Sequence, residues 1–397
     1  MLDEVVGEDV WPLDPEVVFL NHGSFGACPR PVMDAQQLLR DRLERQPVQF
    51  FVRDYENLMI EARSALADFV GAAVEDLVFV ANATTAVNAV LRSLPLQAGD
   101  ELLTTDHEYN ACRNALEFVA DRAGAVTTVA EIPFPVAGPD EVVARVLDRV
   151  SQRTRIALID HVTSQTGLVL PIARIVRELA EQGVDTLVDG AHAPGMLDLD
   201  VRRIGAAYYA GNCHKWLCAP KAAGFLHVRP DRQTVIRPVV ISHGANSPRR
   251  DRSRFVEEFD WVGTCDPTAA LCVPEAIRFM GELVAGGWPE IRRRNRALVL
   301  EGRRLVCAAL EIDPPCPEDM IGSLASMPLP PGSPEPPTSA LYADPLQTRL
   351  LHERGIEVPV IPWPAPPDRL IRVSAQIYNR REQYELLATA LSEIFGT

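Results

Sequence analysis

The fold is decided by two stretches of the chain, Thr186-Leu187-Val188-Asp189-Gly190-Ala191-His192 and Gly211-Asn212-Cys213-His214-Lys215-Trp216. In the first, a short apolar run ends on a carboxylate and a glycine, which is typical of a buried strand in a parallel sheet. In the second, a lysine follows the next apolar run, residues 207–210. An acid and an amine after two successive buried strands indicate a sheet that holds a ligand beyond its carboxyl edge.

The acid and the amine are the two groups that a pyridoxal phosphate enzyme requires. The ring nitrogen of this cofactor must stay protonated, and a nearby carboxylate such as Asp189 favours the protonated form. The cofactor's aldehyde needs a lysine that can lose its proton, so we expect Lys215 in a partly desolvated, cationic pocket. His214 is placed to serve the phosphate. Taken singly, Lys215 also fits a surface lysine and Asp189 a strand-end cap, and only their order at strand ends favours the cofactor site.

The segment from residue 60 to residue 230 alternates short apolar runs with amphipathic stretches. This alternation predicts an α/β fold with a mostly parallel sheet sandwiched by helices. The predicted strands are 77–80, 101–104, 126–129, 156–159, 186–188, 207–210 and 224–228. The predicted helices between them include 111–122, 140–150 and 172–181, whose apolar residues recur at helical spacing.

Polar side chains follow most of these predicted strands. Ligands of open parallel sheets bind beyond the carboxyl ends of the strands, so we expect these side chains to converge on one crevice. In strand order they are Asn82, Thr84, His107, Ser164, Asp189 and Lys215.

The chain changes in character after residue 270. A long helix is predicted over 290–310, and the proline-rich stretch 313–345 predicts irregular edge strands and loops. The last unit is predicted as a helix (349–355), two strands (358–361 and 370–375) and a helix (381–395). We therefore expect three parts, which are an N-terminal segment (1–20) packed on the small domain, a large cofactor-binding domain (21–270) and a smaller α+β C-terminal domain (271–397).

The composition argues against several classes of partner and site. The chain has 397 residues and a formal net charge of −15, so neither a nucleic acid nor an anionic membrane is an expected partner. The acidic N-terminus and the lack of a long apolar run predict neither a signal peptide nor a membrane span. Eight cysteines without a paired framework favour reduced thiols, no metal site and a cytoplasmic location.

One dense basic stretch interrupts this acidic chain. A solvated loop is its first interpretation, and an arm that reaches an acidic rim of a neighbouring subunit is the alternative. Its members are Arg249, Arg250, Arg252 and Arg254.

A phosphate site is predicted at Ala81-Asn82-Ala83-Thr84-Thr85-Ala86, between a strand and a helix. The first N–H groups of a helix are unpaired and lie at the positive end of its dipole, so a phosphate fits there without a glycine-rich loop. The threonine hydroxyls add donors, although an ordinary threonine N-cap explains the same residues. His107 is a candidate to stack on the pyridine ring, and its alternative is a hydrogen-bonded polar residue at a strand end.

Several motifs occur in one order along nearly the whole chain. They are Asn82-Ala83-Thr84-Thr85-Ala86, Asp106-His107, Asp189-Gly190-Ala191-His192, the run 211–216 followed by 220–225, and Arg372-Val373-Ser374. In this order they resemble the class V aminotransferases of pyridoxal phosphate fold type I. The runs 21–26, 355–360 and 372–379 resemble isopenicillin N epimerase-like proteins within that superfamily. The resemblance implies the fold type I architecture, a smaller α+β C-terminal domain and pyridoxal 5'-phosphate as the cofactor.

The resemblance also implies roles for the catalytic residues. Lys215 would form the Schiff base with the cofactor, Asp189 would pair with the ring nitrogen, and His107 would stack over the ring. His192 would hydrogen-bond the cofactor's phenolic oxygen. Arg372 would clamp the substrate carboxylate with its guanidinium fork.

The same resemblance implies that Thr85, Asn212 and His214 hold the phosphate. Thr84 and Ser164 are further candidate cofactor contacts because of their places after predicted strands. The family pattern implies a homodimer with shared active sites, in which the phosphate bound by the other subunit would be reached by Gly263 and Thr264. The remaining candidate substrate contacts are Asn21, His22 and Tyr109.

Two departures from the family pattern bear on the substrate. Relatives commonly carry a basic residue where this chain has Cys265, so a substrate or phosphate contact there is missing or is supplied elsewhere. Cysteine desulfurases use a loop cysteine ahead of the carboxylate-binding arginine, and no cysteine occurs between Cys316 and Arg372. Chemistry through an enzyme persulfide is therefore disfavoured, because it needs a reactive thiolate within reach.

The implied activity is isopenicillin N epimerase-like, on an α-amino acid or an aminoadipyl-type peptide. The α-proton would leave an external aldimine, with Lys215 as general base. Epimerisation also needs a second proton donor, for which the candidates are Tyr109, His22, a water or one mobile lysine. A β-eliminating C–S lyase uses the same carbanion, and an aminotransferase or a decarboxylase also remains open. From a different class, a binding protein without turnover is disfavoured by the intact Asp189 and Lys215.

Overall fold

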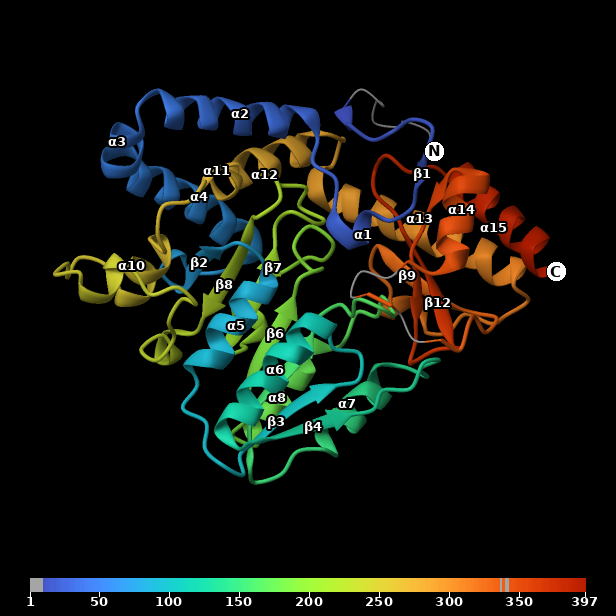
Figure 1. The fold of residues 1–397 in the computed structure, drawn as a ribbon, viewed down its shortest axis with the longest axis horizontal. Coiled ribbons are helices and arrows are strands. Elements are labelled where there is room, and N and C mark those ends of the chain that lie inside the picture. Colours follow the sequence, from blue (N-terminus) through green and yellow to red (C-terminus); the bar gives the residue numbers. More distant parts are fainter. Residues whose placement is uncertain (1–9, 336–337, 340–342) are drawn as a thin grey trace.

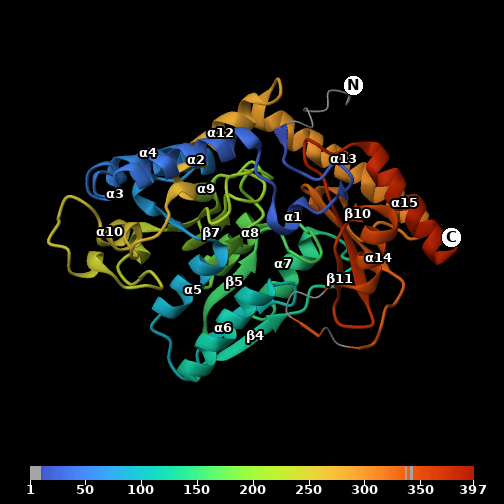
Figure 2. The same ribbon diagram turned by 45° about the horizontal axis from the view of Figure 1, so that its top comes forward.

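The computed structural model describes residues 10–335, 338–339 and 343–397, and Figures 1 and 2 show it from two sides. Its centre is a seven-stranded sheet of order β2-β8-β7-β6-β5-β3-β4. Only β8 in this sheet runs antiparallel to its neighbours, so the predicted mostly parallel sheet is confirmed. The strands are β2 (Leu77–Val80), β3 (Glu101–Thr105), β4 (Val126–Ala130), β5 (Thr154–Asp160), β6 (Asp185–Gly190), β7 (Tyr208–Asn212) and β8 (Gly224–Val228).

Both faces of this sheet are covered by helices. In β5, Ile156 and Leu158 join one apolar cluster, and Ala157 and Ile159 join the other, as the alternation of a strand requires. Burial on both faces explains why the sequence shows continuous apolar runs. The first face is covered by α5 (Ala83–Ser93) and α6 (Asn110–Ala123), and the second by α8 (Ile172–Glu181), with α7 (Pro139–Leu147) packed on α8.

A layer of helices from residues 22–70 and 268–282 packs beside the sheet (Figure 1). Some of its apolar side chains face outward: Phe25 is 68% exposed, Leu38 is 70% exposed and Val52 is 73% exposed. The helices are α1 (His22–Phe25), α2 (Arg30–Arg45), α3 (Pro47–Gln49), α4 (Tyr55–Val70), α11 (Thr268–Leu271) and α12 (Val273–Glu282). Among the residues described, none of the helices combines the length and the apolar character that crossing a lipid bilayer demands.

The C-terminal part builds a second, antiparallel sheet of order β11-β12-β9. The strand in the proline-rich stretch, β9, is an edge strand of this sheet, as predicted. β1 (Val18–Phe19) pairs with β10 (Ile356–Glu357), which ties the N-terminal segment to this part, whereas residues 1–9 of that segment lie outside the described residues. The other elements are β9 (Leu324–Leu329), β11 (Val360–Pro362), β12 (Arg369–Ser374), α13 (Gly287–Ala309), α14 (Pro345–Arg354) and α15 (Arg381–Phe395).

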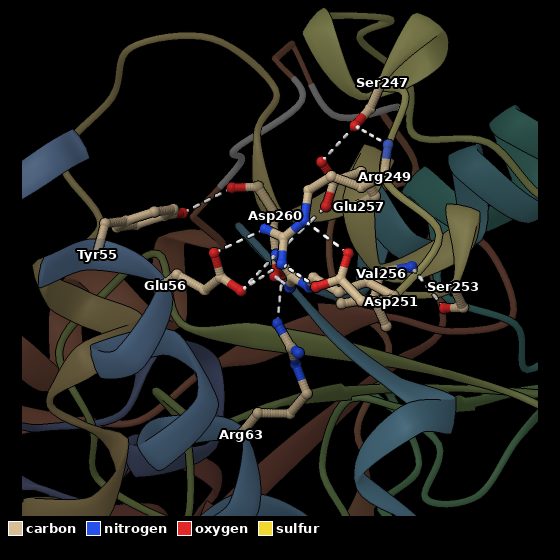
Figure 3. A network of polar contacts seen from close by, with 11 residues as sticks. Tyr55, Glu56, Arg63, Ser247, Arg249, Asp251, Ser253, Val256, Glu257 and Asp260 are labelled. Carbon is tan, nitrogen blue, oxygen red and sulfur yellow. Dashed lines mark hydrogen bonds and ion pairs between the residues drawn. The ribbon is translucent and has the colours of Figure 1, made fainter. Parts of the chain in front are cut away.

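The basic stretch is not a solvated loop throughout, and for two of its arginines that prediction is wrong. Arg249 makes two hydrogen bonds to the carboxylate of Glu56, at 2.7 and 3.0 Å. Arg252 is mostly buried and shares the carboxylate of Asp260 with Arg63, so two guanidinium groups meet one acid. Figure 3 shows Arg63 and Asp260 facing each other in this network. This network joins α4 to α10 (Arg254–Asp260) within one chain.

We expect Asp260→Ala to lower the free energy of unfolding by about 3–5 kcal/mol, because it leaves two guanidinium groups without their shared acid in a buried site. Denaturant unfolding of the purified protein measures this loss. The control is Glu353→Ala, which removes an ion pair whose side chains are 49% and 55% exposed. It should cost no more than about 1 kcal/mol. Equal losses in the two variants would contradict a structural role for the Asp260 network.

Candidate active site

The acid and the amine follow neighbouring strands of the sheet. Asp189 lies in β6 and is in register with Ala210 of β7, and the chain leaves β7 at Asn212 to reach Lys215. Gly26 packs against this turn with a φ of +71°, and a Cβ there would lie 2.1 Å from the carbonyl oxygen of His214. Only glycine fits at this close approach, so the N-terminal loop holds the lysine turn in place.

Lys215 belongs to a short chain of hydrogen bonds that determines its charge state. Its Nζ lies 2.9 Å from Nε2 of His192, and the indole N–H of Trp216 donates to Nδ1 of the same ring at 3.2 Å. An indole N–H can only donate, so Nδ1 must be an unprotonated acceptor and Nε2 must carry the imidazole proton. That N–H then donates to Lys215, and an amine accepts a hydrogen bond only when it is neutral. The geometry therefore favours the free-base form of the lysine.

The electrostatics of Lys215 agree with this hydrogen-bond chain. Burial and the positive charge of Arg372 together lower the pKa of Lys215 to about 8, while Asp189 acts in the opposite direction. Burial and the neighbouring Lys215 also hold the pKa of His192 well below its usual range, so the ring stays neutral. A lysine of this kind is a nucleophile and a base near neutral pH.

We expect Trp216→Phe to raise the pKa of Lys215 by about one unit, because His192 is then free to move its proton to Nδ1 and accept from a lysine ammonium. The pH dependence of acetylation of Lys215 by acetic anhydride, followed by peptide mass spectrometry, measures this pKa. Trp261→Phe, a substitution in the loop after α10, is the matched control and should leave the profile unchanged. An unshifted profile in Trp216→Phe would contradict the proposed tautomer.

Asp189 accepts hydrogen bonds from two donors. It is buried, and its oxygens accept from the N–H of Ala191 at 2.9 Å and from the thiol of Cys112 at 3.1 Å. Hydrogen bonds to the charged form of a carboxyl favour that form. Asp189 is therefore suited to face a protonated ring nitrogen.

Arg372 brings a positive charge into the site without an acid to balance it. It lies on β12 and is buried, and its guanidinium donates to the carbonyl oxygen of Ser164 and to Oγ of Ser24, the latter at 2.9 Å. Burial lowers the pKa of Arg372 to about 10. In the described part of the chain it has no ion pair, and its Nε has no hydrogen-bond partner. A buried guanidinium in this state is suited to bind a carboxylate from outside.

The predicted substrate residue Asn21 acts on Arg372 through Ser24. The hydroxyl of Ser24 accepts from Arg372 and donates to Oδ1 of Asn21 at 2.5 Å. The amide of Asn21 donates in turn to Glu357 at 3.1 Å. This relay orients the guanidinium and connects it to an acid that lies outside the site.

The start of α5 shows which donors remain for a phosphate. Asn212 accepts from the N–H of Ala83 at 2.8 Å, and Asn82 accepts from the N–H and the hydroxyl of Thr85 at 2.9 and 3.1 Å. These bonds leave the N–H of Thr84 and the amide group of Asn212 as donors. The phosphate role of these residues stays a prediction, with the carbonyl side of Asn212 already used by the helix.

The histidines of the site differ in what they bond. His107 is buried, with Nε2 at 2.9 Å from the carbonyl oxygen of Ile132 and Nδ1 at 2.7 Å from Thr166. His214 donates from Nδ1 to the carbonyl oxygen of Ala223 at 3.0 Å, and burial lowers its pKa to about 4. Because Nδ1 carries the proton of the neutral ring, Nε2 has only a lone pair. A hydrogen bond from Nε2 to a phosphate oxygen therefore requires a second proton on the ring.

His22 and Tyr109 were the candidates for a second proton donor. His22 is fully buried and lies 3.1 Å from the carbonyl oxygen of Lys215, and burial lowers its pKa to about 3. It therefore braces the lysine backbone and does not face the amine. Tyr109 is 44% exposed and lies close enough to Arg372 for their charges to interact, so of the two it is better placed for a substrate.

Gly263 and Thr264 lie on the loop after α10, which packs on the edge strand β2. Gly263 has a φ of +111°, and Thr264 is exposed. The loop starts at Asp260, so the arginine network of Figure 3 holds its base. Their role in a partner's phosphate site stays a prediction.

Sequence reasoning missed three residues of this site. Trp216 and Ser24 lie inside quoted motifs, but their roles depend on His192 and Arg372, which are distant in the chain. Cys112 lies at helical spacing among apolar residues, so its pattern indicated only burial. The available signal for a role in the site was its position in the first turn of α6, five residues after His107.

Comparison with known proteins gives consistent matches. The family model for aminotransferase class-V matches residues 27–299. The isopenicillin N epimerase of Amycolatopsis lactamdurans is 38% identical over 96% of this chain and 96% of its own length. A probable chloroplastic L-cysteine desulfhydrase of Arabidopsis thaliana is 31% identical over 96% of this chain and 83% of its own length. A solved structure of a C-DES mutant, with glycine covalently linked to its PLP cofactor, has a TM-score of 0.78 at 22% identity over 96% of this chain and 97% of that chain, and it supports the fold alone.

Proposed function

Because the chain belongs to the class V aminotransferase family, we propose that this enzyme binds pyridoxal 5'-phosphate and removes the α-proton of an amino-acid substrate. One observation carries the proposal. Arg372 is buried and has no acidic partner among the described residues, and it lies close enough to Lys215 for its charge to lower the pKa of the lysine. The buried cation of Arg372 favours an anionic substrate, and a carboxylate bound to Arg372 would bring the substrate's Cα toward the amine of Lys215.

The donor set fits the cofactor at three points. Asp189 offers an anion for the ring nitrogen, Lys215 offers a neutral amine for the aldehyde, and the start of α5 offers the N–H of Thr84 for the phosphate. When bound, the cofactor supplies the electron sink that makes an α-proton acidic. This match between chemistry and residue types supports the cofactor and its proposed contacts.

The chain's own residues then divide the remaining work. Arg372 holds the carboxylate, and Ser24 with Asn21 fixes the guanidinium. Lys215, displaced from the cofactor, takes the α-proton on Nζ. His192 donates to that amine in the free protein, and it would bond the cofactor's phenolic oxygen once the lysine has moved.

We expect Arg372→Ala to lower kcat/KM by about a hundredfold or more, with most of the effect in KM, because the substrate carboxylate then enters a site without its cation. Steady-state kinetics with the confirmed substrate measure this change. Arg372→Lys keeps the positive charge but loses the bidentate guanidinium, so its kcat/KM should lie between those of the wild type and the alanine variant. An unchanged KM in Arg372→Ala would exclude a carboxylate clamp.

We propose a homodimer as the working form. The exposed apolar side chains of Phe25, Leu38 and Val52 support it, since a partner chain would bury apolar surface that the single chain leaves in water. The exposed Thr264 is available to a partner's phosphate site. Analytical ultracentrifugation should find two chains per particle, and a monomer with full activity would contradict the shared site.

The proposed reaction is epimerisation at Cα, and C–S lyase chemistry is the second candidate. The 38% identity to an isopenicillin N epimerase supports the first, and the 31% identity to an L-cysteine desulfhydrase supports the second. The two reactions share the proton abstraction and differ in whether the substrate carries a leaving group on Cβ. Transamination and decarboxylation use the same residues without such support from these relatives.

Incubation in deuterated water with isopenicillin N, L-cysteine or L-cystine separates these reactions. Deuterium at Cα with inverted configuration identifies an epimerase, and pyruvate with ammonia identifies a lyase. An oxo acid identifies a transaminase, and carbon dioxide identifies a decarboxylase. A protein that neither binds pyridoxal phosphate nor exchanges the α-proton of any of these compounds would refute the proposed function.

A further inference from the structure

A cluster of buried acids lies behind Asp189, on the face of the sheet that α6 covers. Asp160 of β5 is in register with Asp189 of β6, so both side chains leave the sheet on the same face. Glu108 lies just before α6 and Cys112 lies in its first turn. One carboxylate oxygen of Glu108, Sγ of Cys112 and one carboxylate oxygen of Asp189 lie within 4.8 Å of one another. All four residues are buried.

The carboxyl groups of Glu108 and Asp160 face each other, and in their ionised forms both groups could only accept hydrogen bonds. Among the described residues, no donor reaches either carboxyl oxygen of Glu108 or Oδ2 of Asp160. The two carboxyl groups nevertheless lie within hydrogen-bonding reach of each other. Ionised carboxylates only accept hydrogen bonds, so this contact is a bond only if one of the two carries a proton. Two ionised carboxylates in contact would also repel in a buried site.

Asp189 differs from this pair because it has donors of its own. The N–H of Ala191 at 2.9 Å and the thiol of Cys112 at 3.1 Å both favour its ionised form. Of the three acids, Asp189 is thus the one best able to hold a negative charge.

The electrostatics around the pair point the same way. Burial and the charge of Asp189 raise the pKa of Glu108 well above its usual range, and burial and Glu108 do the same for the pKa of Asp160. The basic residues that face the pair lower the pKa of its members. Arg113 of α6 lowers the pKa of Glu108, and Lys215 lowers that of Asp160, but both effects are smaller than burial. Burial and the nearby Asp189 raise the pKa of the Cys112 thiol, so it stays a neutral donor.

We propose that Glu108 and Asp160 share at least one proton at neutral pH and thereby confine the negative charge of the cluster to Asp189. Both are positioning residues, because they act on Asp189 and not on substrate. With both members of the pair ionised, three anions would stand together and repel one another in a buried site. The consequence for a ring nitrogen rests on the proposed function, whereas the shared proton does not.

Infrared spectroscopy of the full-length protein at neutral pH tests the shared proton directly. A protonated carboxyl has a C=O stretching band separate from the carboxylate bands, and the wild type should show it. Glu108→Gln and Asp160→Asn should each weaken the band, and the double variant should lose it. Glu101→Gln is the matched control: Glu101 is a buried glutamate on β3, but it is bonded to Ser151 at 2.5 Å and to Arg153 at 2.6 Å, which lower its pKa. This control should keep the band.

The pH dependence of unfolding gives a second, independent measurement. The pKa of Glu108 in the folded state is raised above its ordinary value of 4.5, so its contribution to stability is full below that pH and declines as the pH rises toward the folded-state pKa. Glu108→Gln should remove this decline, and its denaturation midpoint at neutral pH should equal or exceed that of the wild type. Glu101→Gln should lower the midpoint at neutral pH, because a carboxyl with a lowered pKa stabilises above its ordinary value and loses that effect as the pH falls.

The outcomes separate this inference from the proposed function. A wild type without the acid band, or Glu108→Gln destabilised at neutral pH as Glu101→Gln is, would overturn the shared proton even if pyridoxal phosphate binds. Suppose instead that the band is lost in the double variant, but the wild type does not bind pyridoxal phosphate. That result would support the shared proton and refute the proposed function.

Discussion

Lys215→Ala is expected to abolish the visible absorbance of bound pyridoxal phosphate and to lower kcat by about 10⁴-fold or more. The variant loses both the covalent attachment of the cofactor and the amine that takes the α-proton, and general base catalysis alone contributes about 10²–10⁴-fold. Absorption spectra of the protein mixed with pyridoxal phosphate, followed by turnover assays, measure both effects.

The control for this variant is Lys221→Ala, in the same turn. The amine of Lys221 donates to the carbonyl oxygen of Gly26 at 3.0 Å, so it is committed to the backbone. This variant should keep the visible band. Unchanged visible absorbance in Lys215→Ala would refute the assignment of the lysine, and with it the proposed site.

Asp189→Ala should retain some cofactor but lose about 10²–10³-fold in kcat. The phosphate and lysine contacts remain, whereas the preorganised negative charge for the ring nitrogen is gone, and charges of this kind contribute on that order. Asp189→Asn should lose a similar factor, since an amide cannot stabilise a protonated ring. Titration with pyridoxal phosphate and turnover assays separate binding from catalysis.

The control for Asp189 lies at the other end of the same strand. Asp185 pairs with Arg229 and Arg232, and Asp185→Asn should leave kcat unchanged. Normal turnover in Asp189→Ala would count against an electron-sink role for this acid.

Local patterns predicted the scaffold of the site. Apolar runs of three to five residues between amphipathic stretches determine where strands of a doubly covered sheet lie, because each strand is buried on both faces. Asp189 and Lys215 follow two such runs, so their convergence could be inferred from parallel strand direction alone. The C-terminal helix was predicted with the bounds that the structure gives, Arg381–Phe395, because its periodicity is uninterrupted.

Pairs that are distant in the chain were out of reach of such patterns. Ser24 bonds Arg372 across 348 positions, and Asp160 meets Glu108 only because α6 folds over the sheet. The prediction that Arg252 lies in a solvated loop was wrong for the same reason. Its partner Asp260 also binds Arg63 of α4, which is distant in the chain. Periodicity records burial, but it does not record which donor meets which acceptor.

The amino-acid sequence by itself determined where the strands of the site lie along the chain and which residue types follow them, since both can be read from short-range apolar patterns. Only the tertiary structure decided the charge of each group. The free-base form of Lys215, the unbalanced charge of Arg372 and the ionised form of Asp189 all depend on donors and burial supplied by segments far away in the chain. The physical reason is that a protonation state is set by the local surroundings in space, and those exist only after the chain has folded.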